Sequence, residues 1–243
     1  MSLLAKVSRR LRRFVRSIGY GYAELPADAP LGSADWLIGA EMRFGGHVSN
    51  VERRAVSRAD PRNESELRRA GMTGGDRMFI HGYAPIYAEH LAPFVARRLD
   101  KLTIVEAGIL RGSGLAVWAE LFPNADVIGL DIDLSHTKEN LPNLKALGAF
   151  SKREPELHVF DQFLDGEAKM KEILKSRRID IFIDDGFHSI ETIMNTFRAA
   201  LPFLAQPFVY FVEDNDDAAP ILAAAYPDKR VTGSGEMTVI EPR

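Results

Sequence analysis

The chain of 243 residues contains no cysteine. This absence excludes disulfide scaffolds, thiolate zinc sites, iron–sulfur clusters and cysteine nucleophiles. The sequence also has no apolar run of about 18 residues, the length that a helix needs to cross a bilayer. It lacks a strong net charge, because 31 basic and 34 acidic side chains leave a formal charge of −3. We therefore expect a globular protein with an ordinary core and no overall attraction to nucleic acid.

Basic side chains gather at the N-terminus, where residues 1–18 carry no acid. Apolar residues recur in this segment at steps of three and four, which predicts an amphipathic helix. It has no uninterrupted apolar run of about seven residues, so we do not expect a secretory signal. We define residues 1–20 as a basic arm that lies on an anionic membrane surface, packs on another subunit of a homo-oligomer, or is disordered. The expected location is the cytoplasm, with any membrane contact peripheral and at the inner face. The six basic residues are Lys6, Arg9, Arg10, Arg12, Arg13 and Arg16.

Residues 21–100 are predicted to form an N-terminal cap region of loops and helices. Its first part is rich in glycine, proline, aspartate and arginine, with helical patches expected near 49–58 and 63–71. Short elements of this kind do not make a core of their own. We expect them to cover the domain that follows.

A longer apolar helix is predicted at the end of the cap region, over about 83–98. Pro85 is tolerated near its start, whereas Pro93 is expected to kink or split it. Tyr83 and Tyr87 are four residues apart and share one helical face. Two roles stay open for them: they either close over a bound ligand or pack in the core.

The second half of the sequence alternates short β-rich runs with helical patterns. Such alternation predicts right-handed crossovers and a mostly parallel sheet with helices on both faces. Two final β-like runs around Gly233-Ser234-Gly235 predict an antiparallel hairpin. This is the layout of the class I S-adenosylmethionine (SAM)-dependent methyltransferase fold, so we predict an α/β, Rossmann-like, seven-stranded domain over 101–243 with a helical N-terminal extension. The expected strands are 102–108, 126–132, 156–161, 179–185, 208–214, 228–233 and 236–241, with a helix near 217–226.

The first run ends in a glycine-rich turn, VEAGILRGSG. In open α/β sheets ligands bind beyond the carboxyl ends of the strands, and glycines there let the backbone approach a ligand closely. Gly108 and Gly112 are therefore candidate cofactor residues. Short-chain dehydrogenases use the same glycine spacing for a dinucleotide. However, the Glu106 carboxylate suits a cationic methionine group and would repel a pyrophosphate, and the chain has no Tyr-x-x-x-Lys pair.

The second and third runs also end in carboxylates. Asp131 or Asp133 is expected to accept hydrogen bonds from ribose hydroxyls, with Asp131 favoured. Asp161 is expected to take the adenine amino group, and Gln162 to line the same pocket. Each aspartate has an ordinary alternative role as a helix N-cap.

The fourth and fifth runs end in IDDGFH and FVEDND. The acids at these neighbouring strand ends would repel one another without a cation, and oxygen ligands suit Mg²⁺ or a similar ion. We expect Asp185 to hold the metal and Asp184 to face the cofactor, because adjacent strand residues point to opposite faces. His188 is the candidate general base, since imidazole exchanges a proton near neutral pH.

Together with HGYAPIYAEHL and GLDID, these motifs resemble the metal-dependent sugar O-methyltransferases of macrolide and rhamnoside antibiotic pathways, related to the macrocin type, over roughly residues 72–214. The resemblance implies SAM on the glycine turn, Mg²⁺ on Asp185, Glu213 and Asp214, and His188 as the base. It implies that the metal chelates two vicinal sugar hydroxyls, on a glycosylated metabolite or on a polysaccharide or lipid-linked sugar. A catechol-like vicinal diol as acceptor and a noncatalytic SAM-binding scaffold are the alternatives.

This chain departs from the family pattern at three places. Gly112-Ser113-Gly114 stands where Gly-Gly-Ser is common, Phe187 replaces a serine before the motif histidine, and Asp76-Arg77 replaces an Asp-Lys pair. The last change keeps the charge but alters the donor geometry.

Overall fold

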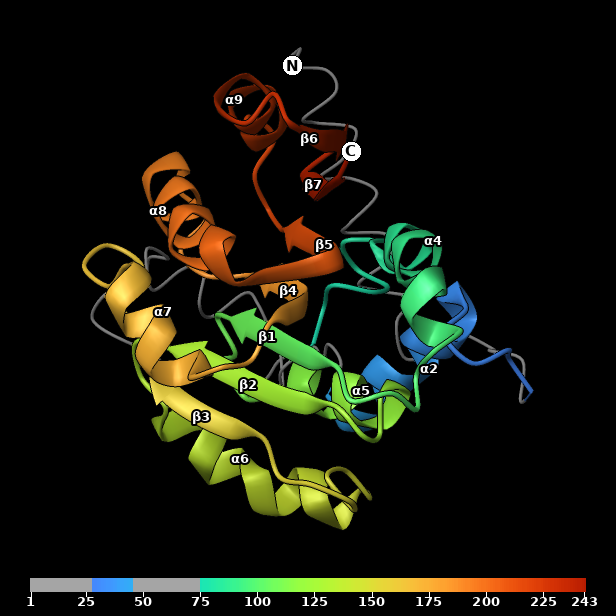
Figure 1. Ribbon diagram of the computed structural model, residues 1–243. Helices are drawn as coiled ribbons and strands as arrows, with labels where there is room; N and C mark the ends of the chain where they lie inside the picture. Colours follow the sequence, from blue (N-terminus) through green and yellow to red (C-terminus); the bar gives the residue numbers. More distant parts are fainter. Residues whose placement is uncertain (1–27, 46–74) are drawn as a thin grey trace, which may run out of the picture.

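The computed structural model describes residues 28–45 and 75–243 (Figure 1). The basic arm and the helical patches predicted near 49–58 and 63–71 lie outside the described residues. None of the helices in the described part is long and apolar enough to cross a membrane.

The described chain forms a seven-stranded sheet in the order β3-β2-β1-β4-β5-β7-β6. Strands β1 to β5 pair in parallel, and β7 pairs antiparallel with both β5 and β6. The predicted fold class and the C-terminal hairpin are thus confirmed. The strands are β1 (Thr103–Ala107), β2 (Asp126–Asp131), β3 (Glu156–Val159), β4 (Ile179–Asp184), β5 (Leu204–Val212), β6 (Lys229–Ser234) and β7 (Met237–Pro242).

Helices cover both faces of this sheet (Figure 1). Most side chains of the central strands are apolar on both sides, because each face packs against a helical layer. One layer contains α2 (Ala34–Phe44), α4 (Ala84–Val95), α5 (Ser113–Leu121) and α6 (Ser135–Ala146). The other contains α7 (Glu167–Leu174), α8 (Ile190–Ala200), the 3₁₀ turn η2 (Leu201–Phe203) and α9 (Ala218–Ala225).

Strand order reverses between β1 and β4, which lie side by side in the middle of the sheet. Ala107 at the end of β1 is in register with Leu130 of β2 on one side and with Asp184 of β4 on the other. Asp184 is in turn in register with Val212 at the end of β5. The loops that follow four strands therefore emerge at one level, at the edge where α/β sheets bind ligands.

Three details differ from the sequence expectation. Pro93 does not split α4 but lies inside it, in the last turn before the helix ends at Val95. Strand β5 begins at Leu204 rather than at 208. The hairpin turns at Gly235 and Glu236, one residue later than expected. The division of the chain at residue 101 stays a prediction, although α2 and α4 share one apolar cluster with the sheet.

Candidate active site

The glycine turn after β1 packs directly against the loop after β4. The Asp185 N–H donates to the Ala107 carbonyl at 2.8 Å, and a Cβ added at Gly108 would lie 1.9 Å from the Asp185 carbonyl oxygen. Gly108 and Gly112 also have φ angles of 83° and 76°, which favour glycine. The chain itself therefore requires these two glycines, and their role toward a cofactor stays a prediction.

Asp131 closes the same turn from the side. Its Oδ2 accepts the N–H groups of Ile109 at 2.9 Å and Leu110 at 3.1 Å. Burial raises the pKa of this carboxyl, and the backbone donors partly oppose the rise. Asp133 is instead half-buried and accepts from the Ser135 N–H at 2.9 Å, which lowers its pKa. It lies just before Leu134, the N-cap residue of α6.

Gln162 joins the loop after β3 to β4. Its amide nitrogen donates to Asp184 at 2.7 Å, and its oxygen accepts the Phe187 N–H at 2.8 Å. A Cβ at Gly186 would overlap that oxygen at 1.9 Å. The neighbouring Asp161 accepts the N–H of Phe163, two residues later, in a local turn. In this structure Gln162 is thus a connector between two loops, and an adenine contact by either residue is untested.

Asp184 points into the protein. Its carboxylate accepts from Gln162 and from the Tyr210 hydroxyl at 3.1 Å, and 2% of the residue is exposed. Burial raises its pKa to about 6. Asp184 and Asp185 are therefore separated in environment, as alternation along the strand predicts, but the role of Asp184 toward a cofactor stays a prediction.

Arg77 lies at the centre of the acidic cluster. Its Nη2 donates to Glu106 at 2.6 Å and to Asp185 at 2.8 Å, while its Nε lies 3.2 Å from Glu213. Glu106 also accepts from the Trp118 indole N–H at 3.0 Å. The protein itself thus supplies one cation to the predicted acids, the Arg77 guanidinium, from the segment before α4.

The pKa directions show that one guanidinium does not balance this cluster. Burial opposes the charge of Arg77, but the carboxylates of Glu106, Glu213 and Asp185 outweigh it and raise the Arg77 pKa. Burial raises the pKa of Glu106 and of Glu213, although Arg77 counteracts it. Acids outnumber cations here, so a further cation would lower the electrostatic free energy of the site.

Asp214, which follows Glu213 after β5, has its own partners from the cap region. Its Oδ1 lies 2.6 Å from His81 Nδ1 and accepts from the Tyr83 hydroxyl at 2.5 Å. His81 Nε2 lies 3.3 Å from Asp76, and the two carboxylates raise the His81 pKa against the effect of burial. The positive His81 in turn lowers the Asp214 pKa, although burial opposes this. Asp214 is therefore ionised.

Glu41 fixes the segment that carries Arg77. Its carboxylate, on α2, accepts the N–H groups of Met78 at 2.9 Å and Phe79 at 3.3 Å. Burial raises the Glu41 pKa to about 7. The cap region thus supplies both the cations and the buried acid that positions one of them.

His188 stands in an unusual backbone conformation beside these acids. Its φ is 63° and that of Asp214 is 58°, values that non-glycine residues rarely adopt and that cluster at functional sites. His188 Nδ1 lies 3.2 Å from the Glu213 carbonyl oxygen, which can only accept. Nδ1 therefore carries the proton in the neutral ring, and Nε2 is the basic nitrogen. Nε2 lies 3.8 Å from Asp185 Oδ1.

The donor set at this point fits a divalent cation. One ligand atom each from Asp185, His188 and Asp214 lies within 4.8 Å of the others. Carboxylate oxygens suit Mg²⁺, whereas an imidazole nitrogen is a poorer ligand for it. Glu213 is held instead by Arg77 and by the Tyr87 hydroxyl. The structure thus brings together two of the three predicted metal ligands with the predicted base, and the metal role of Glu213 stays a prediction.

Sequence reasoning did not foresee the roles of Arg77 and His81. Tyr87 packs between Trp118 and Phe211 while it donates to Glu213, so packing, one of its two expected roles, is confirmed. The available signal was an arginine and a histidine four residues apart within an apolar stretch, where a charged side chain needs a buried partner.

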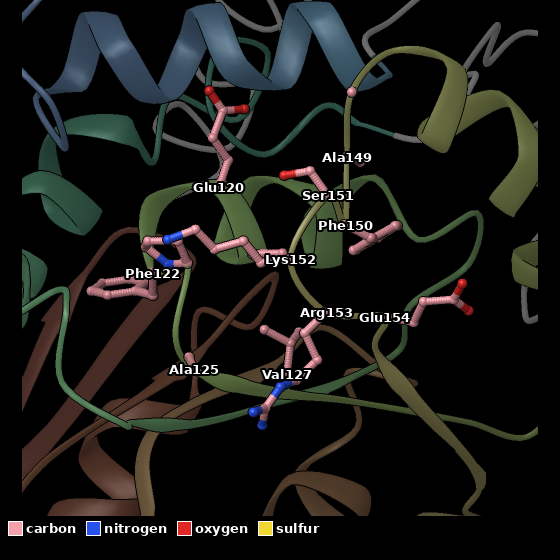
Figure 2. Close-up of a pocket in the computed structure, with 13 residues that line it drawn as sticks. Glu120, Phe122, Ala125, Val127, Ala149, Phe150, Ser151, Lys152, Arg153 and Glu154 are labelled. Atoms are coloured by element: carbon pink, nitrogen blue, oxygen red, sulfur yellow. The ribbon is translucent and has the colours of Figure 1, made fainter.

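A cavity of about 120 Å³ lies at the opposite edge of the sheet (Figure 2). The end of α5, the start of β2 and the loop 148–154 surround it, with Phe122 beside the charged side chains of Glu120, Lys152 and Arg153. None of the predicted site residues lines this cavity.

Comparison with known proteins agrees with the motifs. No protein-family model matches the chain. It is 30% identical over 195 residues to 8-demethyl-8-alpha-L-rhamnosyl tetracenomycin-C 2'-O-methyltransferase from Streptomyces olivaceus, covering 75% of this chain and 46% of that protein. It is 29% identical over 141 residues to mycinamicin VI 2''-O-methyltransferase from Micromonospora griseorubida, covering 56% and 32%. The chain thus spans less than half the length of these relatives.

Among solved structures, the MycE methyltransferase in complex with Mg and SAH (S-adenosylhomocysteine) has a TM-score of 0.53 to this chain. The match covers 68% of this chain and 51% of MycE at 19% sequence identity. This similarity shows the class I methyltransferase fold. Both named relatives are O-methyltransferases, and the name of the first includes a rhamnosyl group, so the resemblance to sugar O-methyltransferases is confirmed.

Proposed function

We propose that the chain is a SAM- and Mg²⁺-dependent O-methyltransferase that acts on a hydroxyl of a sugar. The observation that carries this proposal is the meeting of Asp185, His188 and Asp214 at two neighbouring strand ends. The named relatives are O-methyltransferases, one of them of a rhamnosyl compound, and the MycE structures contain Mg, SAH and, in one crystal, mycinamycin VI.

The residues divide the chemistry between them. Asp185 and Asp214 would hold the cation, with Glu213 joining them if it leaves Arg77. When bound, the cation supplies Lewis acidity that lowers the pKa of a coordinated hydroxyl. His188 Nε2 accepts the hydroxyl proton, because Nδ1 is fixed as a donor to the Glu213 carbonyl. SAM, when bound, would supply the methyl group to the deprotonated hydroxyl oxygen, with its thioether as the leaving group.

The cofactor would bind along the strand ends that the sequence singled out. The residues proposed for it are Glu106, Gly108, Gly112, Asp131, Asp133, Asp161, Gln162 and Asp184. Asp131 has the clearest support, since it already binds the backbone of the glycine turn. Asp184 has the weakest, since its carboxylate faces Gln162 and Tyr210.

The acceptor class is proposed from the relatives, as a glycosylated small molecule or a glycan. A catechol-like diol would satisfy the same cation, because chelation needs only two adjacent oxygens. The proposal also includes a cytoplasmic homo-oligomer, a methyltransferase domain over 101–243, and an arm over 1–20 that contacts either a membrane or another subunit.

Two measurements test this function. Calorimetry should show binding of SAH, and mass spectrometry should show a gain of one methyl group on a glycosylated acceptor from a panel that includes catechols. Exhaustive chelation should abolish transfer, and Mg²⁺ should restore it. Full activity after chelation would refute the metal mechanism, and absence of SAH binding would refute the function itself.

A further inference from the structure

Asn215, which follows Asp214, connects the loops after β4 and β5 with the C-terminal hairpin. Its side-chain Nδ2 donates to the His188 carbonyl at 2.8 Å, and its Oδ1 accepts the Asp217 N–H at 2.9 Å. The bond to Asp217 is a local turn, which fixes the amide so that its nitrogen points to His188. The Asn215 backbone N–H donates to the Glu236 carbonyl at 3.0 Å, in the turn between β6 and β7. One asparagine thus binds two other segments of the chain.

The two left-handed residues of the site lie next to these bonds. His188 has a φ of 63° and presents the carbonyl that Asn215 binds. Asp214 has a φ of 58° and directly precedes the N–H that Glu236 holds. Because the peptide unit is planar, each of these bonds fixes the ψ angle of one left-handed residue. Such a backbone is unfavourable for residues with a Cβ and persists only where surrounding contacts hold it.

His188 is a single residue between two fixed points. On one side, the Phe187 N–H donates to Gln162 Oε1 at 2.8 Å. On the other side, Ser189 is the N-cap of α8. The bond between His188 Nδ1 and the Glu213 carbonyl is at the long end of the ordinary range, at 3.2 Å. A small rotation of the His188 backbone would therefore break it and allow the other tautomer of the ring.

We propose that Asn215 is a positioning residue for the general base, a role that rests on the proposed function. Its amide holds the His188 carbonyl, and this keeps Nδ1 on the Glu213 carbonyl and Nε2 beside Asp185. A base must present its free nitrogen to the proton that it removes, and a misplacement of about 1 Å costs up to roughly 100-fold in rate. Asn215 acts through His188, and not on the substrate or the cation itself.

Steady-state kinetics with SAM, Mg²⁺ and the acceptor identified by mass spectrometry tests this role. Asn215→Ala should lower kcat about 10-fold or more, while the KM for SAM changes less than about twofold. In a His188→Ala background the same substitution should change kcat less than about twofold, because no base remains to be positioned. Asn124→Ala is the matched control, because Asn124 Nδ2 donates to the Leu99 carbonyl at 2.7 Å at the opposite edge of the sheet. It should keep the kcat of the unmodified protein.

Nitrogen NMR of the imidazole rings measures the same role without an acceptor. At about pH 9, where free imidazole is neutral, the His188 ring should be mainly in the Nδ1–H form in the unmodified protein and in Asn124→Ala. In Asn215→Ala it should move toward the Nε2–H form. The loss of one signal in His188→Ala identifies the ring. If Asn215→Ala does not fold, Asn215→Asp keeps the bond to Asp217 but turns an acceptor toward the His188 carbonyl, and should give the same changes.

Three results would overturn the proposal while the proposed function stands. They are an unchanged kcat in the Asn215 variant, an unchanged ring form in that variant, and an equal fall in kcat when His188 is already alanine. Absence of SAH binding by the unmodified protein would instead refute the proposed function, and the role of Asn215 in catalysis would fail with it.

Discussion

The two edges of the sheet both pair acids with arginines, yet they differ in balance. At the edge where the strands begin, Asp126 forms ion pairs with Lys101, Arg153 and Arg177. At the same edge Arg97 forms an ion pair with Asp180. Most of these cations are open to solvent. At the edge where the parallel strands end, Arg77 and His81 face a larger number of carboxylates, and the arginine is buried.

The difference shows that ion pairs alone do not identify a site. Balanced, solvent-exposed pairs contribute little and can serve stability only. Among the residues that the structure describes, an excess of buried acid lies where the strands end, beside the left-handed residues His188 and Asp214. Each of these features has a free-energy cost, and a bound cation and cofactor would offset it.

The largest expected effect is on catalysis. His188→Ala should lower kcat by roughly 10²–10⁴-fold while SAH affinity stays the same, because a general base acts in the transition state. His158→Ala, which removes a histidine of β3 that lies 3.6 Å from Glu156, should leave kcat unchanged. Steady-state kinetics with the acceptor identified by mass spectrometry measures both. An unchanged kcat in His188→Ala would assign proton removal to water.

The next effect compares two glycines with positive φ at opposite edges. Gly108→Ala should lower the free energy of unfolding by about 4 kcal/mol or more, because the new Cβ would overlap the Asp185 backbone. Gly148→Ala should cost only about 1 kcal/mol, since its φ is 91° but no atom lies within 4 Å of the new Cβ. Urea unfolding monitored by circular dichroism measures the two. Equal losses would show that the loops after β1 and β4 separate easily.

The third effect compares the two arginines. Arg77→Gln leaves buried carboxylates without a counter-ion and should destabilise the fold by about 3–5 kcal/mol. Arg97→Gln removes a pair whose arginine side chain is 38% exposed and should cost less than about 1 kcal/mol. Thermal unfolding in a chelator measures both, and added Mg²⁺ should recover part of the Arg77→Gln loss. Similar losses of stability in Arg77→Gln and Arg97→Gln would show that the ion pairs at the two edges of the sheet contribute alike.

The smallest effect is on the pH dependence of the free energy of unfolding, to which Glu41 and Glu156 contribute with opposite sign. Glu41 has a folded pKa of about 7 against 4.5 unfolded, so its contribution to stability is complete below pH 4.5 and is lost as pH rises through 7. The total is about 3 kcal/mol or less. Glu156, whose pKa is lowered chiefly by Arg177, instead contributes above its unfolded pKa of 4.5 and loses that contribution in acid.

Unfolding between pH 4 and 8 tests this contrast. Relative to the unmodified protein, Glu41→Gln should flatten the fall in stability between about pH 4.5 and 7. Glu156→Gln should weaken the acid-side loss only, and by less, because Glu156 is partly exposed. A Glu41→Gln variant with the slope of the unmodified protein would show that other buried acids set it.

Most of the sheet could be predicted, because strand runs and turns depend on local patterns. Five apolar runs that alternate with helical patterns predict parallel strands, and parallel strands place their carboxyl ends at one edge. Asp185, His188 and Asp214 therefore met as expected. Gln162 and Asp184 could not be placed in the same way, because both are polar residues at strand ends whose direction depends on Tyr210 and α8.

The sequence by itself determined the sheet, the glycine turn and the acids at its edge, since each follows from spacing along a few residues. Only the tertiary structure decided which cationic side chains form ion pairs with those acids. Arg77 precedes Glu106 by 29 residues and His81 precedes Asp214 by 133, and no periodicity links positions so far apart. Burial of the carboxylates selects the partner, because a buried charge must find an opposite charge wherever the chain brings one.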